Sequence, residues 1–437
     1  MARRADPTPG AEVEIAIESL GARGDGIGRI AGGRPVFVAG ALPGERVRAR
    51  LGPPEAAGLR GMLTAVVAAS PDRAVPPCPH FGTCGGCAAQ HMDGPAYGRW
   101  KEALVADALA AEGIEAEIAP LVALPAASRR RARLFARATA GGPVLGFRAA
   151  RSHAIVDMAD CPALDPRLWA LTGPLRGLFS ELLAPGARAE AEAQEVDGAL
   201  DVVLRLPVGL DAALRERLAR FAAGAGIARL GWQPLAPRPG RGRHPPVETI
   251  VERAPVRAVF GGVPVPLPPL AFLQASRAGE TALVGLVTAR VPEGAATCDL
   301  YAGAGTFTFP LADGRKLAAF DGDAELIGAL EGAARKAGLG ARITAAVRDL
   351  ERRPLSADEL APFAACVLDP PRGGAAAQAR ALAASRVPRV VMVSCNPRSF
   401  ARDARALVAG GYRLGTVTPV DQFVWTRHLE VVAALAR

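Results

Sequence analysis

Short apolar runs separated by glycine and proline turns make up the first 68 residues of the chain. Five of these runs are rich in β-forming residues, and none of them reads as a helix. They cover residues 12–17, 24–30, 34–38, 41–47 and 61–67. Several short strands joined by such turns predict a small β-barrel of the oligonucleotide-binding type.

The middle of the chain combines a helical stretch with an arginine-rich strand. The helix is predicted over residues 97–112, where four apolar residues share one face (Leu104, Val105, Ala108, Leu109). Arginines alternate along residues 128–137, which would place a row of positive charge on one strand face, suited to a phosphate backbone or simply to solvent. A Pro/Gly/Arg loop over residues 233–246 is a further candidate RNA contact.

From about residue 263 the pattern changes to alternating strands and helices, which is typical of a doubly wound α/β sheet. We therefore expect three domains in the 437 residues: a barrel (1–68), a small central α+β domain (69–262) and a Rossmann-like domain (263–437). Residues 93–125 of the central segment are candidates for packing on the third domain.

Composition narrows the class of protein. The net charge of +9 favours a polyanionic partner, but nearly all of it comes from arginine in a chain rich in Ala, Gly and Pro, so it gives only moderate support for nucleic acid. No apolar run reaches the ~18 residues of a membrane helix, and the first residues lack the apolar core of a signal peptide. We expect a soluble, cytoplasmic, monomeric protein, in which the cysteine content argues against a disulfide framework and for a metal site or catalysis.

A glycine-rich turn follows the strand at residues 297–300 and contains Gly303 and Gly305. The third glycine of a dinucleotide fingerprint is missing, because Thr308 stands there. The next strand ends in Asp321, placed to bond ribose hydroxyls, and Asp349 ends the following one on the adenine side. This arrangement resembles the first motif of Rossmann-like S-adenosylmethionine methyltransferases; a nicotinamide cofactor is the alternative.

Three cysteines lie within ten residues of one another, at Cys78, Cys84 and Cys87, and Cys161 follows far downstream. Four thiolates could form a tetrahedral site for zinc or for an iron–sulfur cluster, and the spacing alone does not distinguish them. His80 and His91 flank the group, but we expect four sulfur ligands. The spacing is wider than the C-x-x-x-C-x-x-C of radical S-adenosylmethionine enzymes.

Two further apolar strands end in reactive groups. Asp369 follows one of them and Cys395 follows the next, and open α/β sheets form their active sites at such carboxyl ends. A lone cysteine is more often simply buried. Cys298 and Cys366, which lie inside apolar strands, are expected to serve packing only.

The motifs occur in one order along nearly the whole chain: C-x₅-C-G-G-C-x-x-Q-H, F-x-Q at residues 272–274, D-L-Y-x-G-x-G, L-D-P-P-R, V-S-C-N-P and a late H-x-E at residues 428–430. This order resembles the RNA uracil-5-methyltransferase family. The barrel, with G-x-G-I-x-R and F-V-x-x-A-L-P-G-E, resembles the TRAM domain, an RNA-binding module. A TRAM domain combined with a 4Fe–4S cluster is similar to the bacterial enzymes that methylate 23S rRNA.

The resemblance implies a role for each matching residue. Cys395 is the nucleophile and Glu430 the general base, while His428 is expected to be structural. The four cysteines hold the cluster. The residues implied to line the S-adenosylmethionine pocket are Gln274, Tyr301, Gly303, Gly305, Thr306, Asp321, Asp349 and Asp369. Four residues differ from those usual in the family: Asp321, Thr306, Asp349 and Ser276. Because none of them is the nucleophile, the base or a cluster ligand, we interpret the differences as adjustments that leave the function intact.

The chemistry requires the same groups. Carbon 5 of uracil is a poor nucleophile until a thiolate adds to carbon 6, and the methylated adduct must then lose its carbon 5 proton to a base. The target uridine must also leave its stack.

The sequence leaves three alternatives: a tRNA uracil-5-methyltransferase, a radical S-adenosylmethionine RNA-modifying enzyme, and a non-catalytic RNA-binding protein.

Overall fold

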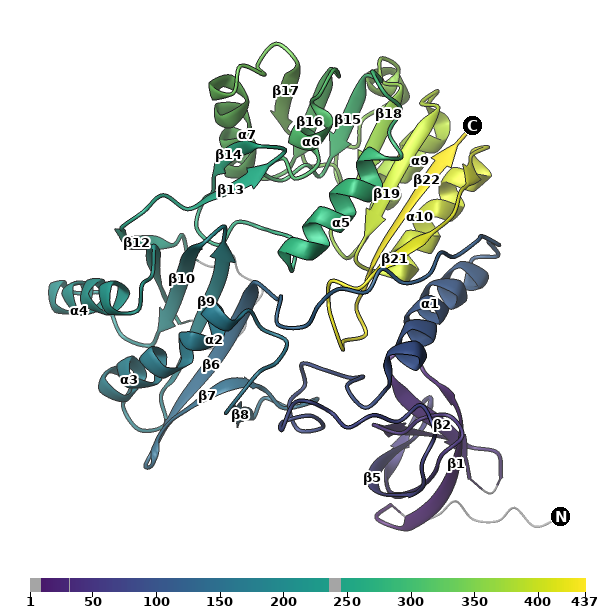
Figure 1. The fold of residues 1–437 in the computed structure, drawn as a ribbon, viewed down its shortest axis with the longest axis vertical. Coiled ribbons are helices and arrows are strands. Elements are labelled where there is room, and N and C mark those ends of the chain that lie inside the picture. The colour runs from purple at the N-terminus through teal and green to yellow at the C-terminus, as the bar shows by residue number, and fades with distance from the viewer. Residues whose placement is uncertain (1–8, 31, 236–244) are drawn as a thin grey trace.

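The computed structural model describes residues 9–30, 32–235 and 245–437, which form a barrel and two large sheets (Figure 1). The first five strands close into a barrel in the order β1-β2-β3-β5-β4, as predicted. They are β1 (Glu12–Leu20), β2 (Asp25–Arg29), β3 (Pro35–Ala39), β4 (Arg46–Glu55) and β5 (Gly58–Ala68). Alternate apolar residues fill the interior, among them Ile15 and Val36. Position 28 requires glycine, because a Cβ there would lie 2.3 Å from the carbonyl oxygen of Ala16.

One of the predicted barrel strands is displaced. Residues 41–45 form a turn, and β4 begins only at Arg46. The cause is the buried carboxylate of Glu45, which accepts hydrogen bonds from the backbone N–H of Leu42 (2.8 Å) and of Ser70 (3.2 Å). Arg73 also pairs with it at 2.5 Å. A side chain that satisfies local backbone donors in this way competes with a strand ladder.

The central sheet has seven strands in the order β12-β11-β10-β9-β6-β7-β8. They are β6 (Arg131–Thr139), β7 (Gly142–Arg148), β8 (Ile155–Asp157), β9 (Arg188–Val196), β10 (Ala199–Leu206), β11 (Arg229–Pro234) and β12 (Glu248–Glu252). Three helices pack on it: α2 (Pro166–Ala170), α3 (Thr172–Leu182) and α4 (Ala212–Gly224). Leu134 of β6 and Leu204 of β10 share a core with Leu175 of α3 and Leu218 of α4. The three helices therefore cover one face of the sheet and leave the other free of them (Figure 1).

The arginine row of β6 is only partly as predicted. Arg131, Arg133 and Arg137 alternate with buried residues and so lie on the helix-free face. Arg130, in contrast, is buried at the start of the strand, where its Nη2 lies 2.5 Å from Oε2 of Glu280. Its Nε also donates to the carbonyl of Gln274 (2.9 Å). A buried arginine needs such partners, so Arg130 joins the central sheet to the C-terminal part instead of facing RNA.

The C-terminal sheet has eight strands, of which seven run in the order β17-β16-β15-β18-β19-β22-β20 and β21 pairs with β22. They are β15 (Thr297–Leu300), β16 (Leu317–Asp321), β17 (Ile343–Val347), β18 (Ala365–Leu368), β19 (Arg389–Ser394), β20 (Arg413–Leu414), β21 (Thr418–Val420) and β22 (Glu430–Ala436). The pairs among β15 to β19 are parallel, whereas β22 runs antiparallel to β19. This is the predicted doubly wound sheet with an added antiparallel strand.

Helices cover both faces of this sheet (Figure 1). They are α5 (Arg277–Thr288), α6 (Thr308–Leu311), α7 (Ala324–Lys336), α8 (Ala357–Leu360), α9 (Ala376–Ala384) and α10 (Pro397–Ala409), and a hairpin of β13 (Arg257–Phe260) and β14 (Val263–Pro266) precedes them. Leu283 of α5 and Leu330 of α7 share a core with Val367 and Val391. The opposite side chains of the same strands, such as Val390 and Met392, pack with α9 and α10.

Helix α1 (Gly94–Ala111) lies against the C-terminal sheet although it is far upstream in the chain (Figure 1). Val105 and Leu109 belong to the core under α10. The buried Lys101 pairs with Asp421 at 2.8 Å and also donates to the carbonyl of His428. Helix α1 belongs to residues 93–125, the segment that the sequence marked as a candidate for packing on the third domain, and it does contact the C-terminal sheet. The three domain boundaries themselves stay predictions.

Two further expectations from the sequence concern the Pro/Gly/Arg loop and membrane helices. Most of the Pro/Gly/Arg loop, residues 236–244, lies outside the described residues, so its RNA contact stays a prediction. Among the described residues, no helix has the length and apolar character needed to cross a membrane.

Candidate active site

Three predicted site residues meet at one edge of the C-terminal sheet. Asp369 directly follows β18 and Cys395 directly follows β19, so both lie at carboxyl ends of parallel strands. Glu430 is the first residue of β22, which runs antiparallel to β19 with Ser394 opposite Val431. The start of β22 therefore lies beside the end of β19. This places the Glu430 carboxyl near the Cys395 thiol.

Burial controls the protonation of these groups. Burial, followed by the charge of Asp369, raises the pKa of Glu430, and burial also raises the pKa of Asp369. Two buried carboxyls that share a site cannot both ionise easily. Burial and the charges of Glu430 and Asp369 raise the pKa of the Cys395 thiol to about 11, and Arg372 opposes this shift. Burial and the neighbouring carboxyls therefore favour a protonated thiol.

Two amide side chains connect the carboxyls. Gln422 Nε2 donates to Glu430 Oε1 and to Gln274 Oε1, each at 2.7 Å. Gln274 Nε2 in turn donates to Asp369 Oδ2 at 3.2 Å. The backbone N–H of Ala275 donates to Gln422 Oε1 (2.9 Å), which fixes the orientation of that amide. The buried Gln422 thus holds both the predicted base and a predicted cofactor residue.

Sequence reasoning missed Gln422. A usable signal was present, because Asp421 and Gln422 directly follow the buried strand β21, just as Asp369 follows β18. Polar residues that end a buried strand in an α/β sheet are site candidates. The hydrogen bonds to Gln274 and Glu430 depend on pairing that only the fold supplies.

The glycine-rich turn after β15 forms a cradle beside this edge. Gly303 and Gly305 have φ values of 55° and 100°, in the left-handed region that glycine tolerates. The backbone N–H of Gly303 donates to Asp321 Oδ2 at 2.9 Å, so the turn and the end of β16 meet as predicted. A Cβ at position 305 would lie 2.6 Å from the Phe309 ring, which requires glycine there.

Unpaired polar atoms surround the cradle. The Tyr301 hydroxyl and one oxygen of Asp299 are buried and have no hydrogen-bond partner among the described residues. Burial raises the pKa of Asp299 to about 7 and that of Tyr301 to about 12, and the charges of Glu351, Asp403, Asp349 and Asp321 add to the latter shift. Buried polar groups normally have partners, so these atoms fit a bound polar ligand.

The remaining predicted cofactor residues are less closely connected. Asp349 follows β17, and its Oδ1 accepts hydrogen bonds from the backbone of Glu351 (3.2 Å) and of Arg352 (3.1 Å). Thr306 is half-buried in the cradle and forms no hydrogen bond with the described part of the chain.

Cys298 and Cys366 are fully buried and lie opposite each other on β15 and β18, which suits packing.

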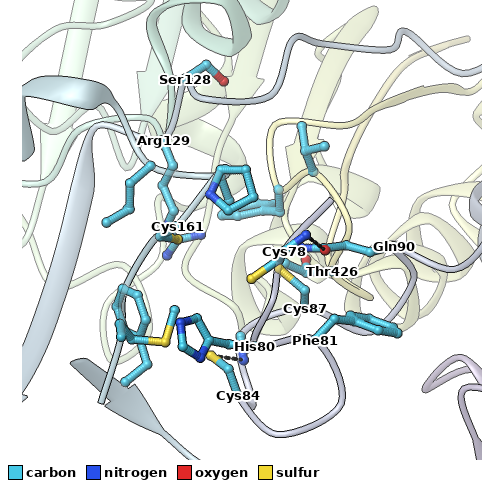
Figure 2. A pocket seen from close by; sticks show the side chains of 18 of the residues that line it. Cys78, His80, Phe81, Cys84, Cys87, Gln90, Ser128, Arg129, Cys161 and Thr426 are labelled. Atoms are coloured by element: carbon cyan, nitrogen blue, oxygen red, sulfur yellow. Dashed lines mark hydrogen bonds between the residues drawn. The ribbon is translucent and has the colours of Figure 1, made fainter. Parts of the chain in front are cut away.

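The four clustered cysteines converge on a second site. Cys78, Cys84, Cys87 and Cys161 all line one cavity of about 220 Å³ (Figure 2). Burial raises the pKa of Cys87 to about 12, and the other three thiols contribute through their charges, so the four groups lie close to one another. As placed, no three Cys, His, Asp or Glu side chains of the described chain have metal-binding geometry. The donor type and the shared cavity fit a thiolate-bound metal centre.

This cavity borders the catalytic edge. Gln422, Phe423, Thr426 and His428, from the loop ahead of Glu430, line it together with the cysteines. The backbone N–H groups of Ala88 and Ala89 both donate to the carbonyl of Trp425, at 2.7 and 3.1 Å. The cysteine segment therefore supports the loop that carries Gln422.

The two histidines near the cysteines are placed differently, because His80 lines the cysteine cavity and His91 does not. His80 Nε2 accepts a hydrogen bond from the backbone N–H of Ala159 at 2.9 Å. Burial lowers the pKa of His91 to about 4, and neither of its ring nitrogens has a hydrogen-bond partner among the described residues. His428, where burial also lowers the pKa to about 4, lines the cavity as a neutral side chain.

Comparison with known proteins gives consistent matches. The TRAM domain family matches residues 7–52, and the tRNA (uracil-5-)-methyltransferase family matches residues 344–437. An uncharacterized RNA methyltransferase of Caulobacter vibrioides is 42% identical, covering 97% of this chain and 100% of that protein. The 23S rRNA (uracil(1939)-C(5))-methyltransferase of Halomonas elongata is 37% identical, covering 97% of this chain and 89% of that protein.

The fold also matches a solved structure. The tRNA (uracil-54, C5)-methyltransferase of Pyrococcus abyssi, in complex with S-adenosyl-L-homocysteine, superposes with a TM-score of 0.76. The match covers 97% of this chain and 99% of that one at 23% identity, which shows the shared fold.

Proposed function

The chain belongs to the RNA uracil-5-methyltransferase family, and from this premise we propose that it forms 5-methyluridine in 23S rRNA. It is an S-adenosylmethionine-dependent enzyme. The observation that carries the proposal is the position of the Cys395 thiol beside the two buried carboxyls of Asp369 and Glu430. The 23S substrate follows the Halomonas relative, which aligns along nearly the full length of both chains.

Cys395 supplies the nucleophile. Its thiolate adds to carbon 6 of the uracil, forming the S–C6 bond and moving the electron pair of the C5–C6 double bond onto carbon 5 and the carbonyl oxygen of carbon 4. The thiol, which is only partly buried, must first pass its proton to solvent, a step that its raised pKa opposes. Arg372, whose charge favours the thiolate, is positioned to help this step.

Bound S-adenosylmethionine supplies the electrophilic methyl group that carbon 5 receives. Gly303, Gly305, Asp321, Asp349, Tyr301, Thr306, Gln274 and Asp369 are proposed to hold it. The unpaired Tyr301 hydroxyl and Asp299 oxygen support a polar ligand in this cradle. Asp369, whose charge acts on the Cys395 thiol, is also proposed to contact the uracil.

Glu430 then removes the carbon 5 proton. The C5–H electron pair forms the C5–C6 double bond, and the bond from carbon 6 to the Cys395 sulfur breaks. Gln422 is a positioning residue in this step, because its amide fixes one Glu430 oxygen at 2.7 Å and leaves the other for the proton.

A direct assay tests the substrate. The enzyme should incorporate methyl groups into a 23S rRNA transcript and yield 5-methyluridine on nucleoside analysis, without any added reductant. A tRNA transcript is the matched control and should remain unmodified. Methylation of tRNA in place of rRNA would contradict the proposed substrate, and a requirement for a reductant would favour radical chemistry.

We further propose that the four cysteines hold a 4Fe–4S cluster, with zinc as the alternative. Their convergence on one cavity supports this, and the neighbouring loop suggests a structural purpose. A centre bound there would hold the cysteine segment against residues 422–428 and so support Gln422 and Glu430. The proposed reaction needs no electron.

Replacing Cys84 or Cys161 with serine is therefore expected to remove bound iron and to lower the unfolding temperature by about 5–10 °C, since metal binding contributes directly to folding. Elemental analysis and thermal unfolding measure both effects. Cys366→Ala, which alters a cysteine of the C-terminal sheet, is the control and should retain its metal. Full zinc occupancy, or a wild-type protein isolated without metal after anaerobic purification, would contradict the cluster.

A further inference from the structure

Two arginines face each other on the helix-free side of the central sheet. Arg137 of β6 and Arg188 of β9 are direct cross-strand partners in an antiparallel pair. Like charges in this position repel and destabilise the pair. Four residues along the same ladder, Arg133 instead faces Glu192 and pairs with it at 2.7 Å. Arg133–Glu192 is the opposite-charge pair on this face of the ladder, whereas its outer end carries two like charges opposite each other.

Neither arginine is neutralised. Arg137 and Arg188 are both exposed, and neither forms an ion pair or a side-chain hydrogen bond with the described residues. The nearest acids of this face are otherwise engaged, since Arg205 Nη1 lies 2.9 Å from Glu192 and 3.8 Å from Glu190. The positive charge at the outer end therefore has no internal counterion in the described chain.

The two guanidinium groups border a cavity of about 390 Å³. His153, Ala154, Ile155 and Gly186 complete its lining, which includes no carboxylate. His153 Nδ1 lies 3.5 Å from Arg148 Nη1, and because arginine can only donate, Nδ1 is the acceptor. The proton of a neutral His153 then resides on Nε2 and is available to another acceptor.

We propose that this cavity binds a backbone phosphate of the substrate RNA, outside the catalytic pocket. Two arginines provide the paired donors that match phosphate oxygens, and a phosphate between them would also relieve their repulsion. The inference rests on the proposed function, because it assumes an RNA substrate.

The position of the cavity fits an RNA path to the active site. Arg131, on the same face of β6, donates to the carbonyl of Leu273 at 3.1 Å, immediately before Gln274. The six residue-to-residue steps from Arg131 to Arg137 span about 20 Å of strand. Between them, the Arg148 guanidinium lies 4.2 Å from the centroid of the Phe135 ring. The face thus connects the catalytic edge with the phosphate pocket.

A charge-neutralising double variant tests the pocket. R137Q/R188Q is expected to weaken binding of a 23S rRNA fragment on the order of tenfold, as two charged hydrogen-bond donors are lost. The slope of log affinity against log salt should fall by about 0.7 for one single-stranded phosphate contact. At saturating RNA the turnover rate should be unchanged. Fluorescence anisotropy at several salt concentrations and methyl-transfer kinetics measure these effects.

R217Q/R220Q is the matched control. It removes the same charge from the same domain, but on α4, which covers the opposite face. Its RNA affinity and salt slope should equal those of the wild type. Since R137Q/R188Q also removes a repulsion, its unfolding temperature should not fall, which excludes misfolding as the cause.

Two results would overturn the proposal. One is an RNA affinity and salt slope of R137Q/R188Q equal to those of the control. The other is weaker binding of free uridine monophosphate with unchanged RNA affinity, which would indicate a small-anion site. Failure of the proposed function would look different: the wild type would methylate no RNA, while S-adenosylhomocysteine binding and the salt-dependent RNA affinities could still be measured.

Discussion

Replacing Cys395 with alanine is expected to reduce methyl transfer by more than about 10⁴-fold, because no other described side chain at this edge can add to carbon 6. Binding of RNA and of S-adenosylhomocysteine should persist, since Cys395 lies after β19, is only partly buried and is not a member of the two hydrophobic cores of this sheet. Single-turnover transfer of a labelled methyl group measures the loss.

RNA that contains 5-fluorouridine gives this prediction a positive signal. With fluorine at carbon 5 there is no proton to remove, so the wild-type protein should accumulate a covalent RNA adduct that survives denaturing electrophoresis. Cys395→Ala should form none, whereas Cys366→Ala should form as much as the wild type. An adduct that persists in Cys395→Ala would assign the nucleophile to another residue.

Glu430→Gln is expected to stall the reaction at a later point. Cys395 can still add to carbon 6 and the methyl group can still be transferred, but the carbon 5 proton has no base. Turnover should fall by about 10²–10⁴-fold, the usual contribution of a general base. A methylated covalent adduct should accumulate even on ordinary RNA, as detected by electrophoresis with labelled S-adenosylmethionine. Normal turnover without an adduct would show that another group takes the proton.

The pH dependence distinguishes this loss from misfolding. Glu430 must be ionised to act as a base, and its raised pKa means that wild-type turnover should fall as pH is lowered from the alkaline side. A carboxyl whose pKa is raised in the folded state contributes stability below its unfolded pKa, and this stability is lost as pH rises through the folded value. Glutamine does not ionise, so the Glu430→Gln variant does not lose stability in this way. Its unfolding temperature should therefore decline less than that of the wild type as pH rises above about 4.5.

Gln422 belongs to the active site although it lies in none of the sequence motifs. It borders the four-cysteine cavity and donates to both Gln274 and Glu430. On the other side of the same loop, Lys101 and Tyr97 of α1 hold Asp421, at 2.8 and 2.7 Å. The predicted base is thus held by residues from three distant parts of the sequence.

Much of the architecture could be predicted from local pattern. The parallel strands that end at Asp321, Asp369 and Cys395 were visible because buried strands of such a sheet are continuous apolar runs. The barrel could be predicted because its strands are short apolar runs between turns. The prediction was wrong at residues 41–45, which form a turn ahead of β4. The carboxylate of Glu45 bonds with Arg73 and Ser70, and such long-range contacts leave no local periodicity.

The sequence by itself determined the family, the glycine cradle, the thiol at a strand end and the set of four cysteines, because each is encoded by residue type and short spacing. Only the tertiary structure decided how these parts meet. The antiparallel pairing of β22 with β19 positions Glu430, and cross-strand register places Arg137 opposite Arg188. The physical reason is that pairing and register between distant strands are set by packing of the whole core, which no short stretch of sequence contains.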